Sequence, residues 1–144
     1  MPTVLGKTFS RRELARRVGD FSQLFGVELL SHCDGRERAL RMLRFHTGSG
    51  LSFDIMVDRA MDLGGMTFRG IPIGWHSPTG FRSPWLHEVD AEDGLGWLRS
   101  FSGMMNSCGL DHIMGATEDT SEHYCYPDRA RVFHTLHGRI SYQP

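Results

Sequence analysis

The stretch LSFDIMVD, at residues 51–58, alternates between apolar and polar side chains with a period of two. One set contains the apolar residues Leu51, Phe53, Ile55 and Val57. The other set contains Ser52, Asp54 and Met56. Successive side chains of a β-strand point to opposite faces of a sheet, whereas those of a helix repeat every 3.6 residues. The pattern therefore predicts a strand with one apolar face.

Two further strand-length apolar runs precede this stretch. They lie within residues 23–35 and 37–50, with Asp34-Gly35 between them and Gly48-Ser49-Gly50 after the second. Glycine-rich turns of this kind are typical of successive hairpins, so strands are favoured in both runs. In residues 38–46 the apolar side chains only roughly alternate with arginines, and a helix stays open as the alternative.

One short helix is predicted at residues 10–18, SRRELARRV. Ser10 followed three residues later by Glu13 has the form of a capping box, and Gly19-Asp20 ends the pattern. The helix is basic on most faces. Since the whole chain is close to neutral, we interpret it as a solvated surface helix rather than a nucleic-acid patch.

The remaining segments are predicted from turn residues and short patterns. Gly70-Ile71-Pro72 indicates a turn or an edge strand, because proline cannot donate to a central ladder, and a short strand follows up to Trp75. Residues 76–94 contain two prolines and predict a long loop, a kind of segment that often carries function. The other expectations are helical turns at 94–101, a strand entering a tight turn at 103–115, a loop at 116–133 and a strand at the end of 134–144.

Together these patterns predict a mainly β domain of the antiparallel sandwich type. We expect a short N-terminal helical segment at residues 1–20, followed by the β-domain at 21–144. The length of 144 residues fits one domain of ordinary size.

Charge and composition exclude several classes of protein. The 16 basic and 17 acidic residues leave a net charge of -1, which gives no attraction to nucleic acid or to an anionic membrane. No apolar run approaches the roughly 20 residues that span a bilayer, and the N-terminus lacks the features of a secretory signal, so we expect a cytoplasmic protein. The three cysteines, Cys33, Cys108 and Cys125, include no CxxC pair and predict no disulfide framework.

Polar residues crowd the end of the strand at residues 51–58. In VDRAMDLGG, Asp58, Arg59 and Asp62 lie within five residues of one another and are followed by two glycines. Two interpretations stay open. The arginine and the carboxylates form a turn-stabilising ion-pair cluster, or they supply hydrogen bonds to a polyol.

The stretch GLGWLRSFSGMMNSCGLDH is the second candidate. Trp97 is suited either to stacking on the apolar face of a sugar or to packing in a core. Asn106, Cys108 and His112 are separated by two and four residues, so on a strand all three would point to one face.

The third candidate is HTLHGRIS, at residues 134–141. His137 can exchange a proton near neutral pH, Gly138 permits close approach of a backbone or ligand, and Arg139 follows. A zinc site made from His123-x-Cys125 and His134-x-x-His137 is an alternative, but these spacings are not those of a zinc finger, and we expect no metal. The chain contains no Walker loop, dinucleotide fingerprint, HExxH or GxSxG, and we expect no cofactor.

Three stretches of the chain are DRAMDLGGMTFRGIPIGWHSPTG, GLGWLRSFSGMMNSCGLDH and LHGRIS, in this order. They resemble the N-terminal half of an aldose 1-epimerase-like family that was long catalogued as a domain of unknown function. The resemblance covers about residues 20–144. That family belongs to the galactose mutarotase-like superfamily, which adopts a large antiparallel β-supersandwich and binds sugars. The resemblance implies the N-terminal half of such a sandwich and a carbohydrate ligand.

The resemblance also implies roles for particular residues. His137 matches the histidine of the family's His-Gly element, which holds the sugar near its ring oxygen or anomeric hydroxyl and would be catalytic here. Arg139 is similar to a neighbour that shapes the site, and Asp58-Arg59 is similar to the family's strand-end pair. With Trp97, Asn106 and His112, these residues make up the expected sugar-binding set.

This chain departs from the family in two respects. The general base of mutarotases is a glutamate far towards the C-terminus, and nothing in this chain matches it, including Glu118 and Glu122. The family usually has glycine where Ala60 stands. We therefore expect these 144 residues to be inactive alone and to expose apolar sheet, with a separately encoded C-terminal half or a homo-oligomer as the partner.

Two other hypotheses stay open. A non-catalytic carbohydrate-binding or interaction module would use Trp75, Trp97, His137 and Arg139 for contacts. A metal-dependent sugar enzyme would use the histidine and cysteine residues described above.

Overall fold

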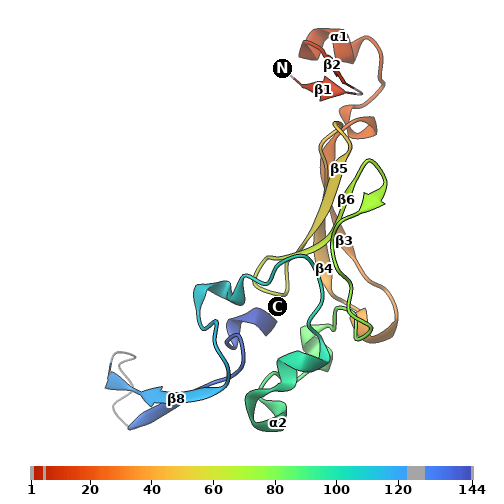
Figure 1. The fold of residues 1–144 in the computed structure, drawn as a ribbon. Coiled ribbons are helices and arrows are strands. Elements are labelled where there is room, and N and C mark those ends of the chain that lie inside the picture. The colour runs from red at the N-terminus through yellow and green to blue at the C-terminus, as the bar shows by residue number, and fades with distance from the viewer. Residues whose placement is uncertain (1, 5, 123–128, 144) are drawn as a thin grey trace.

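The computed structural model describes residues 2–4, 6–122 and 129–143. Its centre is a five-stranded antiparallel sheet in which each strand lies beside the one that precedes it in the chain (Figure 1). The strands are β3 (Gly26–Ser31), β4 (Arg41–His46), β5 (Leu51–Met56), β6 (Asp62–Phe68) and β7 (Ile71–Pro72). The predicted mainly β, antiparallel class is confirmed, and β4 is a strand rather than a helix. Pro72 lies on the edge strand, as its missing N–H requires.

The N-terminal segment forms a small unit at one end of the sheet (Figure 1). It contains a hairpin of β1 (Thr3–Val4) and β2 (Lys7–Thr8), followed by α1 (Arg11–Ala15). Both halves of the predicted capping box form, because the Glu13 N–H donates to Ser10 Oγ at 3.2 Å and the Ser10 N–H donates to Glu13 Oε2 at 2.7 Å. The helix is shorter than the predicted 10–18.

Beyond β7 the elements are short. They are η3 (Pro84–Leu86), α2 (Ala91–Gly94), η4 (Gly96–Arg99), η5 (Cys108–Leu110), β8 (Thr117–Thr120), β9 (Arg131–His134) and η7 (Ile140–Tyr142). Two more 3-10 turns, η1 (Phe21–Gln23) and η2 (Gly35–Glu37), flank β3. No helix in the described part of the chain is long and apolar enough to cross a membrane.

Three local predictions for the C-terminal half were wrong. The expected strand at 103–115 is a turn, because Cys108, Gly109 and Leu110 all have φ between 56° and 59°. The expected loop at 116–133 contains β8 and β9, which pair in register from Thr117 with His134 to Thr120 with Arg131. The expected final strand is the 3-10 turn η7. His123 and Cys125, of the zinc alternative, lie outside the described residues.

Two small cores hold the chain together. The first packs Leu40, Met42, Met56 and Phe81 against one face of the sheet. The second packs Val89, Trp97 and Tyr142 beneath the sheet, with Phe101 and Leu136 against them. The second core joins η4 to η7, two elements about 40 residues apart in the chain, and so positions the site described below.

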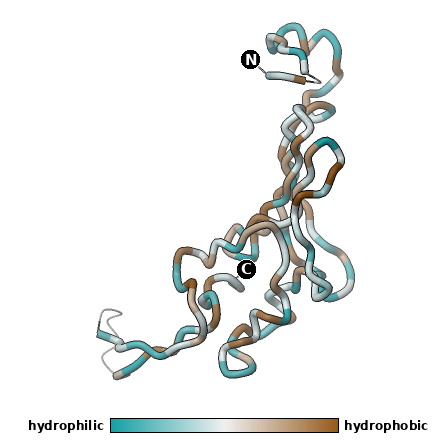
Figure 2. Tube along the Cα trace, viewed as in Figure 1, coloured by the Kyte–Doolittle hydropathy of each residue, from teal (hydrophilic) through white to brown (hydrophobic). Residues whose placement is uncertain are grey.

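The opposite face of the sheet is apolar and is only partly covered by the described residues. Cross-strand pairs place eight apolar side chains on it, which we call the apolar sheet face: Val27, Leu29, Leu43, Phe45, Phe53, Ile55, Leu63 and Met66. Val27 is 54% exposed and Leu29 is 64% exposed. Figure 2 shows the corresponding brown segments along the strands. Val27 and Leu29, on the outer strand β3, are therefore the most accessible part of this face.

We expect this face to bind the apolar dye anilinonaphthalene sulfonate. Replacing Val27 and Leu29 together by threonine keeps residues that favour strands, because threonine is β-branched. The double variant should show lower dye fluorescence, while its free energy of unfolding should change by less than about 1 kcal/mol. Ile113→Thr is the control, because Ile113 is 69% exposed but lies in a loop. Equal fluorescence in all three proteins would contradict the assignment of a partly uncovered face.

Candidate functional site

The first part of the site is the turn between β5 and β6. The Arg59 N–H donates to the Met56 carbonyl at 3.1 Å, and the Asp62 N–H donates to the Arg59 carbonyl at 3.0 Å. Ala60 and Met61 have φ of 50° and 63°, two consecutive left-handed residues. A glycine at position 60 would adopt this conformation without strain. The turn directs the Arg59 side chain into the molecule, where it is 0% exposed.

The Arg59 guanidinium has few partners for a buried cation. Nη1 donates to the Ser100 carbonyl at 2.5 Å, and the group lies 5.2 Å from the ring centre of Tyr142 and 5.7 Å from that of Phe81. Nε lies 3.6 Å from Asp62 Oδ2, too far for a hydrogen bond. Within the described residues, Nε and Nη2 have no hydrogen-bond partner.

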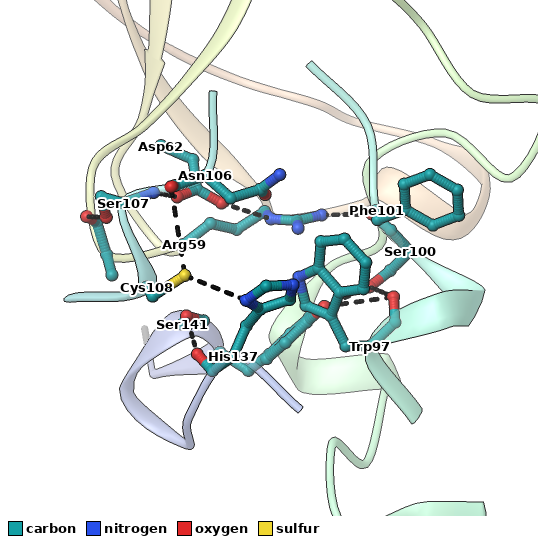
Figure 3. Close-up of polar contacts among 12 residues, drawn as sticks. Arg59, Asp62, Trp97, Ser100, Phe101, Asn106, Ser107, Cys108, His137 and Ser141 are labelled. Atoms are coloured by element: carbon teal, nitrogen blue, oxygen red, sulfur yellow. Dashed lines mark hydrogen bonds and ion pairs between the residues drawn. The ribbon is translucent and has the colours of Figure 1, made fainter. Parts of the chain in front are cut away.

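A second segment, residues 105–108, is tied to this turn. Leu63 and Met105 form an isolated bridge, with the Leu63 N–H donating to the Met105 carbonyl at 2.9 Å. The Ser107 N–H donates to Asp62 Oδ1 at 2.7 Å, and Ser107 Oγ donates to the Ala60 carbonyl at 2.5 Å. These bonds hold Asn106 and Cys108 beside Arg59 (Figure 3).

The third segment brings in His137. Its φ is 60° and that of Gly138 is 74°, and Ser141 Oγ donates to the His137 carbonyl at 2.8 Å. A Cβ on Gly138 would lie 2.6 Å from Asp111 Oδ2, so glycine is required there both for its conformation and for space. The His137 ring lies 4.4 Å from the Trp97 ring, centre to centre, at 59°.

The Cys108 thiol orients the His137 imidazole. Sγ lies 3.3 Å from Nδ1. Burial raises the pKa of Cys108, helped by the charge of Asp62, and burial lowers the pKa of His137. Both groups are therefore neutral near pH 7. The thiol and Nδ1 share this contact, and the tautomer of His137 sets which of the two donates.

Unpartnered polar atoms gather at this place. Among the described residues, eight buried side-chain nitrogen and oxygen atoms lack a hydrogen-bond partner. Five of them lie here, namely Arg59 Nε and Nη2, Asp62 Oδ2, Trp97 Nε1 and Asn106 Oδ1. Buried polar groups in native proteins are nearly always bonded, and exceptions indicate a water, an ion or a ligand. We call Arg59, Asp62, Trp97, Asn106, Cys108 and His137 the Arg59 site.

The structure brings together four of the seven residues expected from the sequence, Arg59, Trp97, Asn106 and His137 (Figure 3). Asp58 is turned away and accepts hydrogen bonds from Arg41. Arg139 Nε lies 3.4 Å from Asp90 Oδ1, in an exposed pair. His112 Nε2 lies 2.8 Å from the Gly115 carbonyl, and its ring stacks on His134.

Two residues of the site, Asp62 and Cys108, were not in the sugar-binding set expected from the sequence. Asp62 follows Arg59 in the stretch DRAMD, but its hydrogen-bond partner Ser107 is 45 residues further along the chain. Burial raises the pKa of Asp62, partly offset by the Ser107 N–H and by Arg59. For Cys108, the spacing from Asn106 and His112 predicted a shared face of a strand, and it did not indicate the contact with His137. No group of three histidine, cysteine or acidic side chains suited to a metal is found within the described ranges.

A second histidine, His87, contacts Ser100, the residue whose backbone carbonyl accepts a hydrogen bond from Arg59. The Nε2 atom of His87 lies 3.5 Å from Ser100 Oγ. The centre of the His87 ring lies 5.0 Å from that of the Tyr142 ring. Burial lowers the pKa of His87 to about 4, assisted by the positive charges of Arg82, Arg59 and Arg99.

The low pKa of His87 predicts acid destabilisation. Between pH 6.5 and about 4 the unfolded histidine binds a proton that the folded one does not, so stability is lost as pH falls through this window. After allowance for partial solvent screening, the loss is about 2 kcal/mol. The raised pKa of Asp62 has the opposite effect, because it favours the folded chain as pH falls. The contribution of His87 is therefore isolated by comparing wild type with His87→Gln. Urea unfolding at pH 7 and pH 4.5 should show a smaller loss in the variant, and equal losses would contradict the assignment.

The comparisons with known proteins agree with this fold. A crystal structure described as that of a "putative aldose 1-epimerase" from Klebsiella pneumoniae subsp. pneumoniae MGH 78578 is similar, with a TM-score of 0.59 and 22% identity. The match covers 86% of this chain and 32% of that chain, so this chain spans about a third of its length. The mainly β, antiparallel fold is thus shared with part of that structure.

The chain belongs to the family described as "Domain of unknown function (DUF4432)", whose model matches residues 37–144. That range contains all members of the Arg59 site. No curated protein matches the chain.

Proposed function

We propose that the protein binds a sugar at the Arg59 site and takes part in aldose 1-epimerase-type chemistry. The observation that carries this proposal is the buried guanidinium of Arg59, whose Nε and Nη2 donors have no partner within the described residues. The same site contains the unpartnered Trp97 Nε1 and Asn106 Oδ1 and a neutral histidine, His137. Sugar sites commonly combine an apolar lining with a few fixed polar groups that orient the ligand.

Each residue would have a distinct part in binding. Arg59 would donate to a hydroxyl or ring oxygen, Asn106 Oδ1 would accept from a hydroxyl, and Trp97, whose ring packs in the second core, would donate from its unpartnered Nε1. His137, whose Nδ1 is held by Cys108, would exchange a proton near the anomeric centre.

Interconversion of anomers needs two groups of opposite protonation state. A base takes the proton of the anomeric hydroxyl and an acid protonates the ring oxygen, after which the ring opens, the C1 carbonyl rotates and the ring closes. His137 would supply one of these groups. The only carboxylate of the site, Asp62, already accepts from the Ser107 N–H. We therefore propose that turnover requires a further carboxylate, from a separately encoded C-terminal portion or another copy of the chain.

The position of Asp62 also favours a second candidate function. A non-catalytic carbohydrate-binding module would need the unpartnered donors and acceptors of the Arg59 site, and no free base.

Calorimetric titration with D-galactose and D-glucose tests binding, and proton NMR of anomer interconversion tests turnover. We expect saturable binding by the 144-residue chain, at least about tenfold weaker in Arg59→Lys, since lysine lacks the planar fork of donors. Gly115→Ala is the control, because nothing lies within 4 Å of its added Cβ. Absence of binding by the folded chain would overturn the proposal. Turnover by the chain alone would contradict the need for a further carboxylate and the non-catalytic alternative.

A further inference from the structure

A polar hollow lies on the core side of the sheet, above Met42 and Met56 and apart from the Arg59 site. Its volume is about 540 Å³, within the range of pockets that hold small molecules. Its polar side chains come from three adjacent strands and the segment after β7, and they are Arg44, Ser52, Asp54, Thr67 and His76. None of these residues belongs to the site described above.

The floor of the hollow is made by a β-bulge with two glycines. Phe53 pairs with Met66 and Ile55 with Leu63, so Asp54 alone faces Gly64-Gly65. A Cβ on Gly65 would lie 3.3 Å from His76 Nε2 and 3.4 Å from Asp54 Oδ2. Any larger side chain at position 65 would therefore fill the space between these two polar groups. Bulges next to binding sites often re-aim side chains in this way.

The polar groups of the hollow keep unused hydrogen-bonding capacity. Arg44 and Asp54 form a two-point pair, with Nε to Oδ1 at 2.9 Å and Nη2 to Oδ2 at 3.2 Å. This pair leaves the Nη1 donors of Arg44 and one lone pair on each Asp54 oxygen. Within the described residues, the Thr67 hydroxyl and the His76 ring nitrogens make no hydrogen bond, and His76 packs edge-on against Phe81 at 5.7 Å.

The balance of charge limits the class of ligand. The guanidinium of Arg44 and the carboxylate of Asp54 neutralise one another, so an anion would meet a carboxylate and a cation would meet a guanidinium. A neutral ligand with adjacent hydroxyls matches the mixture of donors and acceptors, because each hydroxyl both donates and accepts. The glycine floor allows such a ligand to lie close to the backbone.

We propose that the Arg44–Asp54–His76 hollow is a second binding site, for a neutral polyhydroxylated molecule such as a monosaccharide or a small polyol. Asp54 would accept from one hydroxyl, Arg44 would donate to its neighbour, and Thr67 and His76 would bond a third. This site shares no residue with the Arg59 site, although β6 contributes Thr67 to the hollow and Asp62 to the Arg59 site.

A proton–nitrogen correlation spectrum of the labelled 144-residue chain resolves the two sites. The amides of Gly65, Thr67 and Gly74 report on the hollow, and those of Gly109 and Gly138 report on the Arg59 site. Titration with D-galactose, D-glucose and glycerol should shift the first set saturably, and inorganic phosphate should not. Thr67→Val and His76→Phe keep side-chain shape, and each should weaken this response by at least about fivefold.

Arg59→Lys separates this proposal from the proposed function, because it should leave the response of the hollow unchanged. If Gly109 and Gly138 shift and the hollow does not, the second site is overturned and the first survives. A response to phosphate alone would also overturn the proposal, since it would identify an anion site. Unaltered affinity in both Thr67→Val and His76→Phe would overturn it as well.

Discussion

Replacing Gly96 by alanine is expected to lower the free energy of unfolding by about 3 kcal/mol. The added Cβ would lie 2.5 Å from the Glu88 carbonyl oxygen and 2.9 Å from that of Val89. Both are backbone atoms, so no side-chain rotation relieves the contact, and the turn before η4 must move. Because Trp97 follows directly and packs on His137, the same change should weaken sugar binding.

Urea unfolding measures this effect, and Gly115→Ala is again the matched control. Gly115 has nothing within 4 Å of its added Cβ, so its variant should differ from wild type by less than about 0.5 kcal/mol. Equal stability of the two variants would show that the segment around Gly96 is not packed as described.

Replacing Asp58 by alanine is expected to cost about 3 kcal/mol. The carboxylate is 0% exposed and accepts from the Arg41 backbone N–H at 2.8 Å, from Nε at 2.9 Å and from Nη2 at 2.5 Å. Hydrogen bonds to a buried charge are among the strongest in proteins, and all three are lost together. Asp58→Asn keeps one acceptor in the same place and should cost about half as much.

An exposed ion pair gives the contrast. Glu118 and Arg131 are 58% and 65% exposed, and Glu118→Ala should cost no more than about 0.5 kcal/mol. Sugar affinity should stay within about twofold in Asp58→Asn, since its side chain faces Arg41 and not the Arg59 site. A strong loss of affinity in a stable Asp58→Asn protein would place Asp58 in the ligand site instead.

The central sheet could be predicted from the sequence because its signals are local. The alternation at residues 51–58 and the turns at Asp34-Gly35 and Gly48-Ser49-Gly50 define β3, β4 and β5 without reference to distant contacts. The prediction of a strand at 103–115 was wrong because Cys108 and Leu110 adopt positive φ, which their residue types do not indicate. The hairpin of β8 and β9 was missed because TEDT, its first strand, is polar throughout and exposed.

The composition of the site could be predicted only in part for a related reason. Arg59 and His137 stand in recognisable stretches, but they meet through left-handed turns at Ala60-Met61 and at His137-Gly138. No spacing rule could separate Arg59, which points inward, from its neighbour Asp58, which points to Arg41. The bond from Cys108 to His137 spans 29 residues and follows only from the assembled fold.

The most direct test of sugar binding at the Arg59 site is the indole N–H signal of Trp97 in a proton–nitrogen spectrum. Trp97 Nε1 is buried without a partner among the described residues, whereas Trp75 and Trp85 are 53% and 67% exposed. Trp97→Phe assigns the signal. With D-galactose or D-glucose, we predict a saturable shift of the Trp97 signal that is lost in Arg59→Lys. A shift confined to Trp75 or Trp85, with Trp97 unchanged at saturation, would contradict the account.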